Sequence, residues 1–116
     1  MKVLRIVPNF EATDIAEARR FYCDVLGLDL LMDHGWIVTL GSQEQAAIQL
    51  SLASEGGSGT PVPDISIEVD DVDAAHIAMQ QGGFQVDYGP VDEPWGVRRF
   101  HVRDPLGKLV NILAHK

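Results

Sequence analysis

The order of predicted elements repeats once along the chain, and this repeat restricts the possible folds more than any other feature of the sequence. Two predicted helix starts, Asp14 and Asp71, lie 57 residues apart (71 − 14), close to half of the 116-residue chain. One predicted strand precedes each helix and three follow it. The sequence therefore predicts an α+β fold of two βαβββ modules, an internal duplication, with curved mixed sheets around a cavity.

The first module is expected over about residues 1–53. Asp14 and Glu17 have the spacing of a capping box, and Gly27 suits a helix C-cap, so a helix is predicted over 14–26. Apolar residues recur at helical spacing on one stripe of this helix: Ile15, Ala18, Tyr22, Val25 and Leu26. Strands are predicted over 4–7, ended by Pro8, and over 28–32, 36–40 and 47–52.

A Gly- and Ser-rich stretch over about 54–62 predicts a flexible linker, after which the pattern restarts in a second module over about 63–116. A strand over 64–69 leads to a helix over 72–81 that Asp71 caps and Gly82-Gly83 closes. Three strands follow, over about 84–88, 97–103 and 109–113, and residues 104–107 supply the last hairpin turn. Residues 1–116 are thus expected to form a single domain.

Alternation in the strand over 64–69 separates an apolar face from a polar one. The apolar residues, which should face the helix, are Ile65, Ile67 and Val69. The polar residues, which should face the cavity, are Asp64, Ser66 and Glu68. An ordinary antiparallel sheet with one wet face would show the same alternation, so it is the duplication that favours a cavity.

The same rule assigns faces in two other strands. Leu4 and Ile6 are expected on the helix side of the first strand. The expected pairing of the last hairpin places His101 with Val110 and Ile112, also on the helix side. His34 lies in a predicted turn, His76 on the second predicted helix and His115 at the tail of the chain, so none of the four histidines is expected to be catalytic.

Composition restricts the partners and the compartment. A formal net charge of −8 argues against nucleic acid or an anionic membrane as a partner, because phosphates are bound by clustered Lys and Arg. Cys23 is the only cysteine, so no intramolecular disulfide can form, and no apolar run approaches the length of a membrane helix or a signal peptide. We therefore expect a cytoplasmic protein.

Three stretches carry a resemblance to a known family. Phe21-Tyr22-Cys23-Asp24-Val25-Leu26-Gly27 ends the first helix, residues 67–71 open the second module, and residues 93–108 hold the segment Glu93-Pro94-Trp95-Gly96-Val97-Arg98 and the last hairpin. Together they resemble the vicinal oxygen chelate superfamily of glyoxalase I, extradiol dioxygenases, and fosfomycin and bleomycin resistance proteins. The last stretch is most similar to bleomycin resistance proteins.

The resemblance implies a divalent metal held at four strand positions, usually by His, Gln or Glu. Those positions fall on Val7, Gln49, Asp64 and Asn111. Val7 has no donor atom, Gln49 and Asn111 are weak neutral donors, and only Asp64 carries a charge, so a site of two His and one carboxylate cannot be assembled. The sequence therefore predicts a pocket without metal and without another cofactor, and favours a binding protein over an enzyme.

Aromatic and polar side chains of both modules are predicted to bind a small-molecule ligand: Trp36, Gln49, Asp64, Ser66, Trp95, Arg98, Phe100 and Asn111. The two tryptophans would suit a planar or cationic ligand, although packing roles for both stay open. Arg98 and Arg99 are equally open to pairing with surface carboxylates or to holding an anionic ligand.

Three functions stay open. The first is a metal-free binding protein, one form of which is sequestration of a bleomycin-type antibiotic between two subunits, as the resemblance implies. The second is a metal-dependent lyase, isomerase or dioxygenase of the glyoxalase type. The third is a homodimer with a purely structural or interaction role; a homodimer is also what the resemblance implies in general.

Overall fold

The computed structural model describes residues 1–25, 27–42, 49–105 and 107–116, without the side chains of Phe21 and Val25. The chain forms two compact units. The N-terminal unit comprises Val7–Val62, and the C-terminal unit comprises Met1–Ile6 together with Pro63–Lys116. The elements follow one another as βαβββ and again βαβββ, so the predicted α+β class and the predicted duplication are confirmed.

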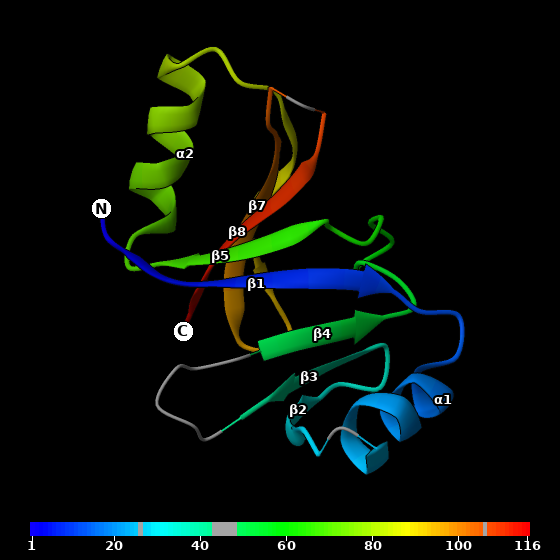
Figure 1. Ribbon diagram of the computed structural model, residues 1–116. Helices are drawn as coiled ribbons and strands as arrows, with labels where there is room; N and C mark the ends of the chain where they lie inside the picture. Colours follow the sequence, from blue (N-terminus) through cyan, green and yellow to red (C-terminus); the bar gives the residue numbers. More distant parts are fainter. Residues whose placement is uncertain (26, 43–48, 106) are drawn as a thin grey trace. The chain divides into compact units, whose positions relative to one another are not determined.

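The N-terminal unit holds a four-stranded mixed sheet of order β2-β3-β4-β1 (Figure 1). Its strands are β1 (Val3–Glu11, of which residues 7–11 belong to this unit), β2 (Asp29–Asp33), β3 (Ile37–Gly41) and β4 (Gln49–Ala53). β1 pairs in parallel with β4, whereas β2–β3 and β3–β4 are antiparallel. Buried Val38, Leu40 and Leu52 pack on one face of this sheet against half-buried helical residues, including Ala18 and Tyr22.

The helix of the N-terminal unit begins where the sequence predicts. Oδ1 of Asp14 accepts the backbone N–H of Glu17 at 3.0 Å, which confirms the N-cap. The helix starts as α1 (Ile15–Arg19) and continues as a π-helical turn, η1 (Arg20–Val25). Gly27 takes a φ of 79°, the left-handed conformation that the C-cap position requires. The periodicity does not distinguish α from π winding, and Leu26, the last predicted helical residue, lies outside the described residues.

The C-terminal unit holds a second mixed sheet, in which the start of β1 is followed by the order β5-β8-β7-β6. Its other strands are β5 (Ile65–Val69), β6 (Val86–Glu93), β7 (Val97–Arg103) and β8 (Leu109–His115). β5 and β8 are parallel, and the hairpins β6–β7 and β7–β8 are antiparallel. The helix α2 (Val72–Gln81) has the predicted bounds, and its N-cap Asp71 accepts the N–H of Ala74 at 3.0 Å.

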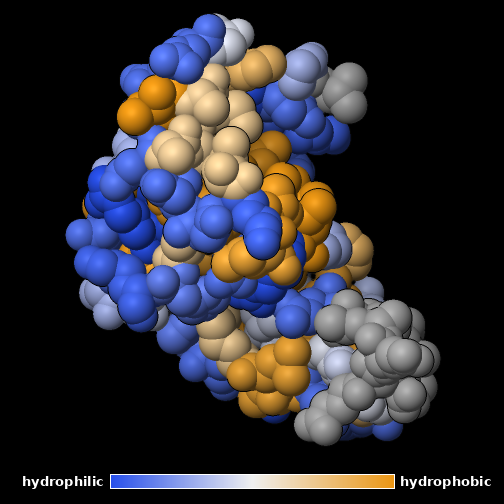
Figure 2. Space-filling model, turned by 90° about the vertical axis from the view of Figure 1, so that its left-hand side faces the viewer, coloured by the Kyte–Doolittle hydropathy of each residue, from blue (hydrophilic) through white to orange (hydrophobic). Residues whose placement is uncertain are grey.

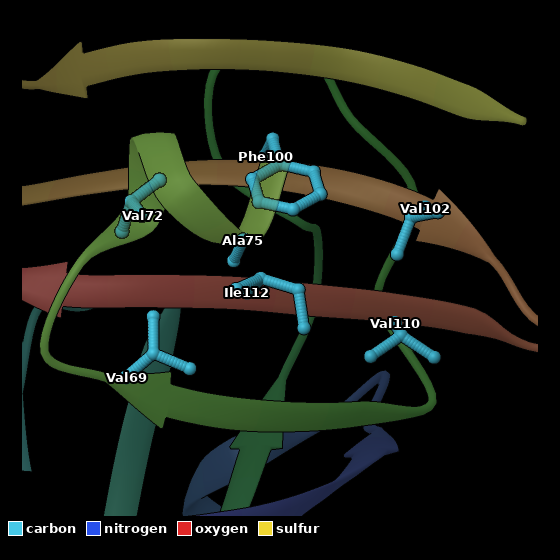
Figure 3. Close-up of a cluster of buried hydrophobic side chains, with 7 residues drawn as sticks. All are labelled: Val69, Val72, Ala75, Phe100, Val102, Val110 and Ile112. Atoms are coloured by element: carbon cyan, nitrogen blue, oxygen red, sulfur yellow. The ribbon is translucent and has the colours of Figure 1, made fainter. Parts of the chain in front are cut away.

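A core of buried apolar side chains joins α2 to one face of this sheet. Figure 3 shows its members: Val69, Val72, Ala75, Phe100, Val102, Val110 and Ile112. Val72 and Ala75 come from α2, and the others come from β5, β7 and β8. Ile65 and Ile67 pack against the cluster, so the predicted apolar face of the strand over 64–69 does face the helix.

The prediction for the first strand is wrong in two respects. β1 does not end at Pro8 but continues to Glu11; the ladder with β4 begins at Asn9, so the missing N–H of Pro8 removes no bond from it. Leu4 and Ile6 do not pack beneath a helix, because they are 54% and 56% exposed. The ten-residue α2 packs on β5, β7 and β8, and neither residue belongs to its core.

Several large apolar side chains are exposed in the C-terminal unit: Met1, Val3, Leu4, Ile6, Ile77 and Phe84. Figure 2 shows apolar patches exposed among hydrophilic surface on one side of the molecule. In the described parts of the chain, no helix combines the length and the hydrophobicity that crossing a bilayer would need.

Candidate functional site

The register of the last hairpin decides which side chains can form a site in the C-terminal unit. Arg103 pairs with Leu109, so the connection comprises residues 104–108 rather than 104–107. Asp104 closes it: its carboxylate accepts the N–H of Lys108 at 2.8 Å, and its carbonyl accepts the N–H of Gly107, which takes a φ of 79°. One extra residue in the connection shifts the pairing by one and reverses the face of each side chain on β7 relative to β8.

His101 therefore lies opposite Asn111 and not beside Val110 and Ile112. The predicted helix-side position of His101 is wrong, because the connection after β7 is one residue longer than predicted. His101 lies instead on the face of the sheet that points away from α2. We call this the polar face and define it by Ser66 and Glu68 of β5, Arg99 and His101 of β7, and Asn111 of β8.

The same register places two predicted ligand contacts on the α2 side. Phe100 is 0% exposed, belongs to the apolar core, and lies edge-on to the ring of His76 at 5.3 Å. Arg98 forms ion pairs with Asp73 of α2 at 2.8 Å and with Asp92 of β6 at 3.1 Å. These bonds raise the pKa of Arg98, whereas hydrogen bonds from Lys116 and from Arg98 lower the pKa of Asp92. Neither Phe100 nor Arg98 reaches the polar face.

A buried ion pair occupies one end of the polar face. The guanidinium of Arg99 donates to Oε2 of Glu93 at 3.0 Å, and both side chains are almost fully buried. The hydroxyl of Tyr88 donates to the other carboxylate oxygen at 2.8 Å. Aromatic rings flank the guanidinium, Trp95 at 4.9 Å and Tyr88 at 5.4 Å from its central carbon. Charge, hydrogen bonds and stacking thus fix Arg99 in place.

His101 lies beside this pair and is neutral at pH 7. It is 1% exposed, and its ring lies 5.3 Å from that of Tyr88. Burial lowers the pKa of His101 to about 4, and the positive charge of Arg99 contributes in the same direction, against opposing effects of Glu93 and Asp87. A neutral imidazole offers one donor and one acceptor nitrogen.

Two polar atoms on directly paired residues of the polar face have no hydrogen-bond partner among the described residues. They are Nε2 of His101 and Oδ1 of Asn111. The amide nitrogen of Asn111, which is 8% exposed, donates to Oγ of Ser66 at 3.1 Å. A buried polar atom without a partner costs about 1–3 kcal/mol, so two such atoms on paired residues require an explanation.

On β5, the polar face carries one carboxylate, that of Glu68, and this carboxylate has partners. The carboxylate of Glu68 accepts hydrogen bonds from Nδ1 of His115, at 2.8 Å, and from Arg5. Burial raises the pKa of Glu68, but these two bonds together outweigh it and lower the pKa below its ordinary value. The charge of Glu68 is therefore matched within the C-terminal unit.

The N-terminal unit has a corresponding face, and it carries no charge on β3 and β4. Thr39 and Ser51 are buried and share a hydrogen bond of 2.8 Å between their hydroxyls. Gln49, a predicted ligand contact, lies on the same side of β4 as Ser51 and is half-buried. Trp36, another predicted contact, is half-buried before β3, and its carbonyl accepts the N–H of Ser54 at 3.0 Å.

A match to a family model identifies the chain. Residues 9–112 match the model of the Glyoxalase/Bleomycin resistance protein/Dioxygenase superfamily. The protein therefore belongs to that superfamily, which the sequence motifs indicated. A search of curated proteins found no significant match.

Several solved structures share the fold of this chain. A structure described as an NAD-dependent benzaldehyde dehydrogenase from Legionella pneumophila superimposes with a TM-score of 0.77 at 17% identity, over 97% of this chain and 100% of that chain. Methylmalonyl-CoA epimerase from Mycobacterium tuberculosis gives 0.69 at 18% identity, over 95% and 86%. An extradiol ring-cleaving dioxygenase from B. fuscum gives 0.68 at 25% identity over 98% of this chain, which spans only 33% of the dioxygenase chain.

The residues at the four positions where the family resemblance predicts metal ligands do not fit a divalent metal. In the N-terminal unit, Val7 offers only hydrocarbon and Gln49 a neutral amide. In the C-terminal unit, Oδ2 of Asp64 accepts the N–H of Leu109 at 2.8 Å, which engages the one charged donor of the set, and Asn111 is again an amide. Among the described residues, no three His, Cys, Asp or Glu side chains lie close enough to hold a metal ion.

The structure thus brings together only some of the predicted site residues. Ser66 and Asn111 are hydrogen-bonded, and Trp95 lies over Arg99 on the same face. Sequence reasoning missed Tyr88 and His101 of this cluster, and it left Arg99 open between a carboxylate partner, which the structure shows to be Glu93, and an anionic ligand. The signal that identifies His101 is the length of the connection after β7, because it determines which residues of that strand face away from α2. Tyr88 then follows from its pairing with His101 across the β6–β7 hairpin.

Proposed function

We propose that this protein binds a small organic molecule, without a divalent metal, on the polar face of its C-terminal unit. The observation that carries the proposal is the gathering of buried polar side chains there, with Nε2 of His101 and Oδ1 of Asn111 lacking partners among the described residues. Sheet faces that serve only as core are apolar, as the α2 side is. A bound molecule that supplies the missing partners would explain the polar face.

The donor set at the family metal positions supports a metal-free mode of binding. Val7, Gln49 and Asn111 provide no anionic donor, and Asp64 is bonded to the backbone. The test is elemental analysis of the protein after dialysis against Zn, Ni, Co, Mn and Fe(II) in turn. Less than stoichiometric metal is expected. One equivalent per chain would contradict the proposal and favour a metal-dependent lyase, isomerase or dioxygenase.

That metal-dependent enzyme is the second candidate. Its support is the fold itself, because similar structures include one described as an epimerase and one as an extradiol dioxygenase. Activity that depends on an added divalent metal and is lost with a chelator would establish it. Retained activity in Asn111→Ala and Asp64→Ala variants would then locate the metal elsewhere.

Trp95 is the proposed aromatic contact of the ligand. It is half-buried, and it already stacks on Arg99. Trp95→Ala should weaken ligand binding by about 1–2 kcal/mol if the ring also stacks on the ligand. Binding is best followed by calorimetry, since the variant loses a fluorophore, with Trp36→Ala as the independent test of the other predicted aromatic contact. Bleomycin is the first candidate ligand, because the resemblance to bleomycin resistance proteins implies it.

A homodimer is the proposed assembly. The exposed apolar residues Leu4 and Ile6 lie on the same face at the start of β1, and an exposed apolar patch of this kind is costly when left in water. Ile6→Glu should convert a dimer into a monomer, as measured by light scattering during size-exclusion chromatography. A wild-type monomer at all accessible concentrations would contradict the dimer, and a dimer without any ligand would favour the purely structural role.

A further inference from the structure

We propose that the polar face binds an uncharged amide group, whose N–H donates to Oδ1 of Asn111 and whose carbonyl oxygen accepts from Nε2–H of His101. This inference rests on the proposed function and specifies its ligand. A primary amide or a lactam presents a donor and an acceptor side by side, as the two atoms require.

The two atoms come from directly paired residues. His101 and Asn111 are cross-strand partners on β7 and β8, so their side chains rise from the same face at neighbouring positions. Asn111 is oriented by its bond to Ser66 on β5, which lies on the other side of β8 from β7. Since the amide nitrogen points toward β5, its oxygen is turned away from β5, and both side chains are more than nine-tenths buried.

The chemistry of the two atoms favours a ligand with at least one donor. An amide oxygen accepts and cannot donate, so the group that meets Asn111 must bring an N–H or O–H. The imidazole nitrogen of His101 can donate in one tautomer, and a carbonyl oxygen is then its complement. The donor of His101 and the acceptor of Asn111 lie on cross-strand partners, and together they match the carbonyl oxygen and the N–H of one amide group.

The charges around these atoms favour a neutral ligand over an ion. Arg99 is paired with Glu93, and Glu68 is paired with Arg5 and His115. An ion buried here would therefore have to compete for a charge that is already matched. The rings of Tyr88, near His101, and of Trp95, over Arg99, flank the face and suit a planar molecule.

Three probes of nearly equal shape separate the possibilities. Benzamide is neutral with a donor and an acceptor, benzoate is an anion with acceptors only, and benzamidine is a cation with donors only. Each is titrated into the full chain and followed by backbone amide shifts in NMR. Benzamide should bind saturably, with shifts on β7 and β8, and more tightly than either ion.

Two variants assign the contacts. His101→Phe and Asn111→Leu keep the size of each side chain and remove its polar atoms, so each should weaken benzamide binding by roughly tenfold or more. Arg98→Gln, on the α2 side of β7, is the matched control and should leave benzamide binding unchanged. Melting temperatures show whether each variant is folded. If one variant fails to fold, the other variant and the probe series decide whether the amide is bound as proposed.

The outcomes separate this inference from the function on which it rests. Benzamidine or benzoate binding on β7 and β8 as tightly as benzamide would overturn the amide ligand but leave a small-molecule binding protein. No saturable binding of benzamide, with an ordered water bridging His101 and Asn111 in a crystal structure, would also overturn it. Stoichiometric metal with no binding of any probe would overturn the proposed function as well.

Discussion

Protonation of His101 should destabilise this protein in mild acid. The imidazole is buried beside the guanidinium of Arg99, and its pKa in the folded chain is about 4. In the unfolded chain an imidazole has a pKa near 6.5. The informative perturbation is a fall in pH from about 7 to about 4.5, compared between the wild type and His101→Phe.

The sign and the size of the change in unfolding free energy follow from proton linkage. Between the two pKa values the unfolded chain binds more protons than the folded one, so the free energy of unfolding falls as the pH falls. The full shift of His101 corresponds to roughly 3 kcal/mol, most of which is lost by about pH 4.5. Wild type should therefore lose roughly 2–3 kcal/mol more than His101→Phe, because the acidic residues titrate in both proteins and cancel in the comparison.

Urea unfolding followed by far-UV circular dichroism at both pH values measures the difference. His101→Gln is the control for polarity, since it removes the titrating ring but keeps polar atoms, and it should behave as His101→Phe does. At pH 7 the Phe variant should be at least as stable as wild type, because it removes a buried polar atom that lacks a partner among the described residues. Equal losses of stability in wild type and both variants would refute the reasoning.

Three further changes test the packing of the C-terminal unit and its helix by urea unfolding. Phe100→Ala should cost about 3–5 kcal/mol, since the ring is 0% exposed in the apolar core; a loss below about 1 kcal/mol would show that the core is not packed as described. Glu93→Leu should cost about 3–5 kcal/mol because it leaves Arg99 buried without its carboxylate, and the double variant Glu93→Leu/Arg99→Met should recover much of that loss. Asp71→Ala should cost about 1 kcal/mol, with Asp71→Asn retaining most of the stability, as an N-cap role requires.

Local signals predicted most of the fold correctly. The helix starts at Asp14 and Asp71 depend only on a side chain reaching an N–H three residues ahead, and both are present. The alternation of Ile65, Ile67 and Val69 is likewise a property of one strand, and it identified the core face. These interactions are short in sequence, so they can be recognised without knowing which strands pair.

Features that depend on pairing were predicted less well. The exposure of Leu4 and Ile6 follows from how far α2 extends over its sheet, which no local pattern records. The wrong face for His101 arose from a connection counted as one residue too short. The cluster around Arg99 was predicted incompletely, because Tyr88 and Glu93 of β6 meet Arg99 and His101 of β7 only in the observed register of the β6–β7 hairpin, which shifts twice along β6.

The five-residue connection between β7 and β8 has a consequence for comparing relatives of this protein. Its odd length is what keeps Phe100 against α2 and Arg99 and His101 away from it. Loss of a single residue there would require a charged side chain to replace a phenyl ring under the helix, whereas loss of two would keep every side chain on its present face. Alignments of relatives should therefore show gaps of even length in this connection, and a relative with an odd gap should also carry an exchanged polar and apolar pattern along β7.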